Sequence, residues 1–173
     1  MGNAQSYENY YVYDDSAFLK SAAAIIEPSK DLIINEILAG NTSVNKDEFG
    51  EYDDWIELYN FGEDTINLNG LYISDSKNDL SKFQIKTDVF VKPKEFILIW
   101  ADGDINQGDL HANFKLDPDG EDIYISDKDL TLLDYLSFNK QSANISYGRL
   151  KNNILSLNYF TTPTPFANSK TVE

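Results

Sequence analysis

The 173-residue sequence contains no cysteine, one histidine (His111) and one arginine (Arg149). The lack of cysteine excludes disulfides, thiolate metal sites, iron–sulfur clusters and cysteine nucleophiles. With one histidine, no two-histidine metal site can form, and any histidine base must be His111. No Gly-x-Ser-x-Gly turn, Gly-x-x-x-x-Gly-Lys loop or His-Glu-x-x-His helix occurs. The usual machinery of hydrolases, nucleotidases and redox enzymes is therefore scarce, and we expect no enzymatic activity.

Basic residues are also few: 14 lysines and arginines stand against 29 aspartates and glutamates, for a formal net charge of −15. Sequence-independent binding of nucleic acids depends on basic side chains, so we expect no nucleic-acid partner. No apolar run approaches the length that crosses a bilayer, and we expect no membrane insertion. No basic-then-apolar signal peptide is visible either.

Apolar residues make up 42% of the chain and aromatics 13%, which is typical of a folded domain and not of an acidic tail. Short β-rich runs are separated by Asn, Asp, Gly and Pro from residue 31 onward. Many short strands with frequent turns predict an antiparallel β-sandwich. The predicted strands are 32–38, 53–60, 68–75, 83–85, 88–91, 95–101, 111–116, 122–126, 130–138, 145–150 and 154–160.

The core is predicted from the two most apolar of these runs. Both alternating faces of 95–101 are apolar, which favours a central strand that is buried on both sides. The side chains that we expect to be largely buried are Trp55, Ile56, Leu58, Leu98 and Ile99.

Several segments in fixed order resemble the lamin-tail domain, an immunoglobulin-like sandwich of nuclear lamins and of bacterial proteins. They are INEI (34–37), DWIELYN (54–60), LNGLYISD (68–75), HANFKL (111–116), SYGR (146–149) and TPFAN (164–168). The family usually has glycine where Phe166 stands. The resemblance implies an all-β, immunoglobulin-like antiparallel β-sandwich over residues 31–168. Residues 1–30 are then an N-terminal linker or short helical extension that ends at Pro28, and 169–173 form a C-terminal tail.

The same resemblance implies a module of a larger, bacterial, secreted or cell-surface protein. Such domains often accompany nucleases, phosphatases or kinases. We therefore expect a non-catalytic interaction or structural module that binds protein or glycan, or that spaces a neighbouring domain. It needs no cofactor, and its oligomeric state is left open by the sequence.

Two carboxylates lie inside strand-like runs, Glu36 and Glu57, with Asn35 beside the first. A carboxylate on the inner side of a sheet must be paired. We interpret both as acceptors of hydrogen bonds from loop amides, and His111 as a structural histidine. The alternative is a small carboxylate-dependent hydrolase that uses a converging pair of acids.

A calcium site is a further alternative. Asp102, Asp104 and Asn106 place oxygen ligands at alternate positions, as calcium loops do. The twelve-residue calcium loop is incomplete, because Gln107 replaces its glycine and Asn113 its final glutamate. The same residue types are also typical of hairpin turns.

A sugar-binding surface is the last alternative, because four aromatic side chains could form a platform for stacking: Trp55, Trp100, Tyr59 and Tyr72. Aromatic residues in a sandwich belong more often to its core. Together with calcium, such a platform would indicate a calcium-stabilised or carbohydrate-binding adhesion module.

Overall fold

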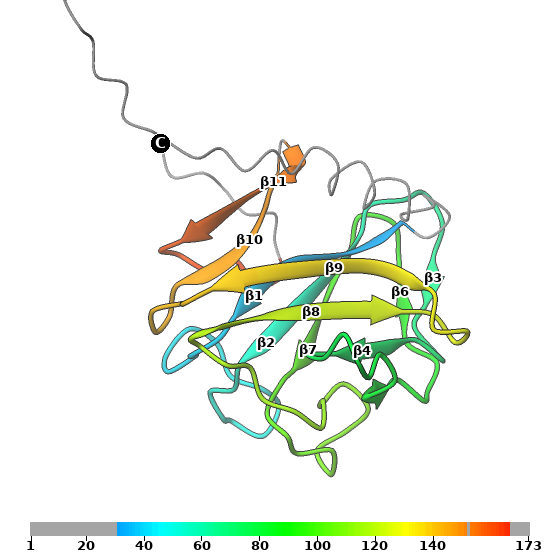
Figure 1. Ribbon diagram of the computed structural model, residues 1–173, viewed down its shortest axis with the longest axis horizontal. Helices are drawn as coiled ribbons and strands as arrows, with labels where there is room; N and C mark the ends of the chain where they lie inside the picture. The colour runs from blue at the N-terminus through cyan, green and yellow to red at the C-terminus, as the bar shows by residue number, and fades with distance from the viewer. Residues whose placement is uncertain (1–30, 152, 167–173) are drawn as a thin grey trace, which may run out of the picture.

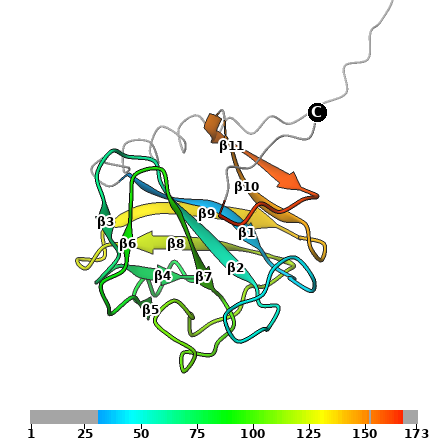
Figure 2. The same ribbon diagram turned by 180° about the vertical axis from the view of Figure 1, so that it is seen from behind.

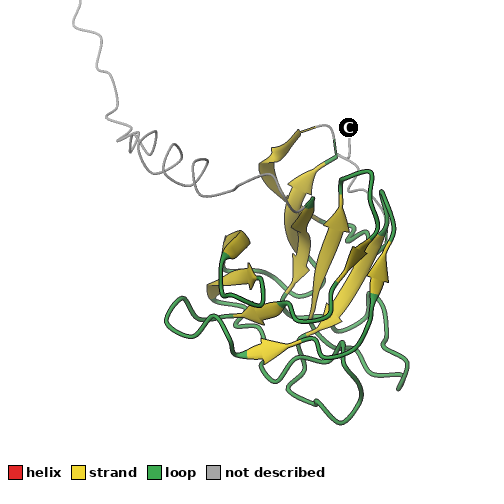
Figure 3. Ribbon diagram, turned by 90° about the vertical axis from the view of Figure 1, so that its right-hand side faces the viewer, coloured by secondary structure: helices red, strands yellow, loops and turns green. Residues whose placement is uncertain are grey.

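The computed structural model describes residues 31–151 and 153–166, and these contain strands and no helix (Figure 3). The predicted extension at 1–30 and tail at 169–173 lie outside the described residues. No helix of the described part is long and apolar enough to cross a membrane. The strands are β1 (Leu32–Leu38), β2 (Trp55–Asn60), β3 (Ile66–Asn67), β4 (Tyr72–Ser74), β5 (Phe83–Gln84), β6 (Phe90–Val91), β7 (Phe96–Trp100), β8 (Gly120–Ser126), β9 (Leu132–Asn139), β10 (Ser146–Leu150) and β11 (Asn153–Phe160).

The strands form two main antiparallel sheets that face each other (Figures 1 and 2). One has the order β11-β10-β1-β2-β7 and the other β5-β4-β8-β9, while β3 and β6 form a short ribbon. Every strand pair in these sheets is antiparallel. The predicted all-β sandwich is confirmed.

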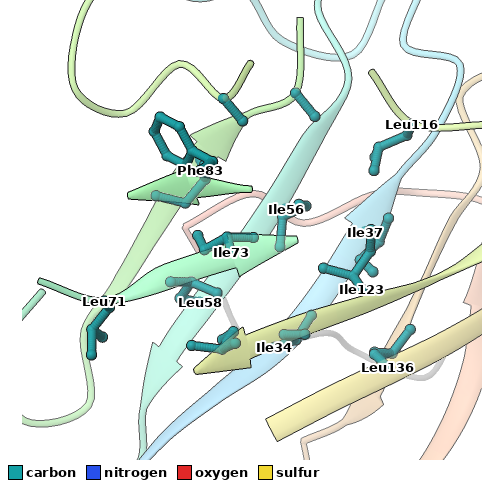
Figure 4. Close-up of a cluster of buried hydrophobic side chains, with 14 of the residues drawn as sticks. Ile34, Ile37, Ile56, Leu58, Leu71, Ile73, Phe83, Leu116, Ile123 and Leu136 are labelled. Atoms are coloured by element: carbon teal, nitrogen blue, oxygen red, sulfur yellow. The ribbon is translucent and has the colours of Figure 1, made fainter. Parts of the chain in front are cut away.

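The main core fills the space between the two sheets. Figure 4 shows Ile34, Ile37, Ile56 and Leu58 of one sheet pointing toward Ile73, Ile123 and Leu136 of the other. Strict alternation would place Ile34 and Ile37 on opposite faces of β1, because they are three residues apart. The ladder to β2 shifts between Ile34 and Glu36, so an extra residue is inserted there as a β-bulge. This bulge lets both isoleucines enter the core and turns Glu36 to the outer face.

A second hydrophobic cluster lies on the outer face of the five-stranded sheet. It consists of Leu38, Trp55, Leu98 and Trp100, with Val44 packed against them. Val44 belongs to the β1–β2 loop, and the next residue, Asn45, accepts a hydrogen bond from Trp55 Nε1 (2.8 Å). The loop is thereby fixed over the cluster. The five predicted core side chains are at most 3% exposed, which confirms that prediction.

Two strand predictions are wrong. β7 is an edge strand of its sheet and not a central one. Its last three residues, 98–100, are nevertheless buried. The loop after β7 returns alongside their end: Trp100 N–H donates to Leu110 O (2.8 Å) and Ala112 N–H to Trp100 O (2.7 Å). Residues 111–116 form no strand and pair only through single bridges at His111 and Lys115. From Ala112 to Leu116 buried and exposed residues alternate, and the buried apolar ones belong to the main core. The alternation in the sequence therefore reflects burial and not pairing in a ladder.

Candidate functional site

Glu36 and Glu57 stand directly opposite each other on β1 and β2. Both are completely buried. Glu36 accepts hydrogen bonds from the hydroxyl of Ser146, from Thr164 Oγ1 (2.8 Å) and from Thr164 N–H (3.1 Å). Its carboxylate therefore fastens the segment after β11 to the outer face of the sheet.

Glu57 completes this attachment. Asn35 Nδ2 donates to Glu57 Oε1 (2.8 Å), and Phe166 N–H donates to Glu57 Oε2. Burial raises the pKa of Glu57 to about 8, against the two hydrogen bonds, and the charge of Glu36 adds to the rise. Acceptance of loop amides is the role expected from the sequence. The two acids share a neighbourhood, and the hydrogen bonds described here attach the segment after β11 and the side chain of Asn35.

Phe166 ends this attachment with an unusual backbone. Its φ is +64°, in the left-handed region that favours glycine, and the residue is 61% exposed. The hydrogen bond from Phe166 N–H to Glu57 holds the chain in this conformation.

His111 lies fully buried at one end of the sandwich, between the loops 41–53 and 102–110. Its Nδ1 is 2.5 Å from Asp102 Oδ2 and its Nε2 is 3.3 Å from Glu48 Oε1, and the Trp100 ring stacks beside it. Burial opposes the charged imidazole, but Asp102 and Glu48 together outweigh it and raise the pKa of His111. With both ring nitrogens engaged, His111 ties the two loops together.

The predicted calcium ligands lie at two successive turns after β7. Asp102 Oδ1 accepts from Asp104 N–H (2.8 Å), and Asp104 Oδ1 accepts from Asn106 N–H (3.2 Å). Asp102 is buried beside His111, whereas Asp104 and Asn106 are exposed. Of these three, only Asp102 joins a wider group of potential ligands within the described chain.

Two groups of acidic side chains that share Asp47 were not identified from the sequence. Carboxylate oxygens of Asp47, Glu51 and Asp53 lie within 4.8 Å of one another, and Asp47 forms a second such group with Asp102 and His111. Asp47 Oδ1 accepts from the N–H groups of Phe49 (2.9 Å) and Glu51 (2.8 Å). This cap folds the loop back on itself, so that acids four and six residues apart converge. The only sequence signal is the acidic run DEFGEYDD (47–54), which reads equally well as a solvated loop.

The same loops hold the unpaired buried polar atoms of the described chain. Four buried side-chain atoms have no hydrogen-bond partner there: Asn45 Nδ2, Asp47 Oδ2, Asp53 Oδ2 and Gln107 Oε1. Burial raises the pKa of Asp53, and the neighbouring negative charges, first Asp102, then Asp47 and Glu51, raise it further. Lys115 opposes this only in part. The arrangement is rich in oxygen and poor in compensating charge.

A cleft of about 420 Å³ lies next to this acidic group. Five apolar and three charged residues line it: Ile97, Leu98, Trp100, Leu110 and Phe166, with Lys46, Asp47 and Glu48. The four aromatics considered for sugar stacking do not form one exposed row. Trp55 is 0% and Trp100 7% exposed, Tyr59 stacks on Phe96 (4.3 Å), and Tyr72 belongs to the other sheet.

The free edge of β11 presents a different surface. Leu155, Leu157 and Tyr159 alternate along the strand and are 84%, 38% and 41% exposed. Leu157 and Tyr159 share one face, because they pair with Arg149 and Tyr147 of β10. Leu155 lies where the ladder to β10 is interrupted, between the pairs Arg149–Leu157 and Leu150–Asn153. We call these three exposed apolar side chains the apolar stripe. β11 is the last strand of its sheet, so its outer backbone edge pairs with no described strand.

In a comparison with known families, the model of the Lamin Tail Domain matches residues 26–140, about two thirds of the chain. Comparison with curated protein sequences gives no match.

Proposed function

The chain belongs to the lamin tail domain family, and from this premise we propose that it is a non-catalytic module that binds an extended segment of a partner protein along β11. The family consists of immunoglobulin-like, non-enzymatic modules. The partner segment is either in another protein or in a neighbouring domain of the same larger protein. A secreted or cell-surface location belongs to the same proposal.

The apolar stripe on β11 carries the proposal. Proteins usually protect long edge strands with charges, proline or a covering element, because an open edge invites pairing. The stripe of Leu155, Leu157 and Tyr159 carries no charge and lies on an eight-residue edge strand, whose ladder to β10 is interrupted only between Asn153 and Leu157. An extended peptide added to such an edge gains main-chain hydrogen bonds, and alternate apolar side chains supply specificity.

The contacts of the reactive residues support a role without catalysis. Glu36 and Glu57 hold the segment after β11, and His111 is enclosed by charged partners. Arg149 is engaged as well: it donates to both oxygens of Asp134 (2.9 Å each) and to Ile34 O (2.8 Å). The single arginine thus supports the sandwich and is not presented to phosphate groups.

The test is a peptide-display selection on the purified chain, followed by calorimetry and NMR mapping of the selected peptides. We expect shift changes centred on β11 and at least tenfold weaker binding in the double variant Leu155→Lys/Leu157→Lys. Phe90→Lys is the matched control, because Phe90 is equally apolar and 61% exposed but lies on β6.

Four results would overturn the proposal. Peptides could map to another surface, or the double variant could bind as tightly as the control. A glycan array could give specific binding that Leu155→Lys/Leu157→Lys leaves unchanged, which would make the module a sugar binder. Finally, sedimentation could show a wild-type dimer that the double variant dissociates, in which case the occupant of β11 is a second copy of the chain.

A further inference from the structure

We propose that the loops 41–53 and 102–110 form a calcium site whose carboxylate ligands are Asp47, Glu51 and Asp53, with the side-chain carbonyl of Gln107 as a further oxygen ligand. This site differs from the Asp102, Asp104 and Asn106 set expected from the sequence. It is independent of the β11 surface, on another part of the molecule.

The first observation is the convergence of three negative charges. The carboxylate oxygens of Asp47, Glu51 and Asp53 lie within 4.8 Å of one another. Gln107 lies next to them, because its Nε2 donates to Glu51 Oε2 (2.7 Å). Reversal of this amide would turn its oxygen, Oε1, toward a bound ion. Within the described ranges, no lysine or arginine forms an ion pair with the three acids. Like charges held this close destabilise the loop unless a cation neutralises them.

The second observation is independent of charge. Asp47 is only 8% exposed, and its Oδ2 is buried without a hydrogen-bond partner. Asp53 Oδ2 and Gln107 Oε1 are buried and unpaired as well. Buried oxygens are almost always satisfied by a donor, water or an ion. Here three unsatisfied acceptors occur in the two loops that also carry the acidic cluster, and this is the pattern that a bound cation would complete.

Calcium fits these ligands better than zinc. All four ligand atoms are oxygens that lie on loops, and calcium takes six to eight oxygens in flexible geometry, including side-chain carbonyls and waters. Zinc prefers nitrogen and sulfur ligands in a closed tetrahedron. The one nearby nitrogen ligand, His111, already contacts Asp102 and Glu48 through its two ring nitrogens.

The place of the site in the fold gives it a role. Asp53 lies two residues before Trp55 of β2, and the loop that carries Asp47 also packs Val44 on the outer hydrophobic cluster. A cation that joins Asp47 and Asp53 to Gln107 would fix the β1–β2 loop to the loop after β7. Calcium would thus stiffen these two loops and the wall of the adjacent cleft, which Asp47 lines.

The experiment measures binding and stability together on the full chain. Calcium binding is followed by calorimetry and by luminescence of Tb³⁺, a calcium substitute that nearby tryptophan excites; Trp100 stacks on His111 at the same loops (ring centroids 6.4 Å). We expect calcium at about 100 times its dissociation constant to raise the melting temperature by about 5 °C or more. Identical melting curves in calcium and in chelator would overturn the proposal.

The variant Asp53→Asn gives the sharper result, because removal of one charge acts in opposite directions with and without the ion. In chelator it should melt at a higher temperature than the wild type, since repulsion is relieved. With calcium it should lose at least tenfold in affinity. If Asp53→Asn does not fold, Asp47→Asn takes its place in the experiment. It keeps an Oδ1 acceptor for the loop amides and should weaken calcium binding to a similar degree.

Asp104→Asn is the matched control, because Asp104 is an exposed aspartate of the second loop and lies outside the cluster. It should leave the affinity unchanged. An equal loss in Asp104→Asn and Asp53→Asn would move the ion to the site expected from the sequence. Zinc binding that survives Asp53→Asn and disappears in His111→Gln would overturn the assignment to calcium.

Discussion

Replacement of Glu57 by glutamine should change how the stability of the protein depends on pH. Burial raises the pKa of Glu57 from 4.5 to about 8 in the folded protein. Between these values the folded state keeps a proton that the unfolded state has released. The contribution of Glu57 to the free energy of unfolding is therefore fully present below about pH 4.5. It declines as the pH rises and is lost once the pH passes about 8.

The magnitude follows from the size of this change. Each unit of pKa is worth about 1.4 kcal/mol, so complete ionisation of Glu57 costs on the order of 3–5 kcal/mol. Glutamine carries no charge to desolvate. Its Oε1 can accept from Phe166 N–H, and the amide of Asn35 can reverse so that its oxygen accepts from the new amide group. The variant should match the wild type near pH 5 and exceed it by a few kcal/mol near pH 8.5.

The assay is chemical denaturation between pH 5 and 8.5, followed by the fluorescence of the buried tryptophans. Glu121, whose burial raises its pKa to about 7, and His111, whose pKa is also raised, change the stability in the same direction. Only the difference between Glu57→Gln and the wild type is therefore informative. Glu63→Gln is the control, because the Glu63 side chain is 87% exposed. A difference that stays constant with pH would show that Glu57 is ionised throughout and refute the reasoning.

The sandwich was predictable because its strands are short, alternate in polarity and are separated by turn residues. The bulge in β1 was not. The run LIINEIL is apolar almost throughout, so nothing in it marks where the alternation shifts. Only pairing with β2 shows that Ile34 and Ile37 share a face. The position of β7 was hidden for a related reason: a strand that loops cover at its edge has the same sequence as a central one.

The acidic cluster was harder to predict than the structural glutamates. Glu36 and Glu57 stood out because each interrupts an apolar strand, where a charge must have partners. Asp47, Glu51 and Asp53 lie in a loop where acids are expected and carry no such signal. Their convergence depends on the cap that Asp47 Oδ1 provides and on the approach of the loop after β7. Both are tertiary features that no spacing rule contains.

Three further changes test the packing and the backbone. Leu98→Ala should lower the free energy of unfolding by about 2–5 kcal/mol, because Leu98 is 3% exposed in the outer cluster; a loss below about 0.5 kcal/mol in urea titrations would contradict its burial. Arg149→Leu should lower the free energy of unfolding by about 3–5 kcal/mol, because the Asp134 side chain is 3% exposed and would lose its charged partner. The further change Asp134→Asn should recover part of this loss. Purely additive effects in the double-mutant cycle would refute the coupling. Phe166→Gly should raise the free energy of unfolding by about 0.5–1 kcal/mol, because glycine adopts a φ of +64° without the steric cost that a side chain carries there. This gain exceeds the loss that comes from the greater conformational entropy of glycine in the unfolded chain. Phe166→Ala is its matched control, because it removes the ring but keeps Cβ: an equal gain in both variants would trace the effect to the exposed ring, and a gain in glycine alone to the backbone.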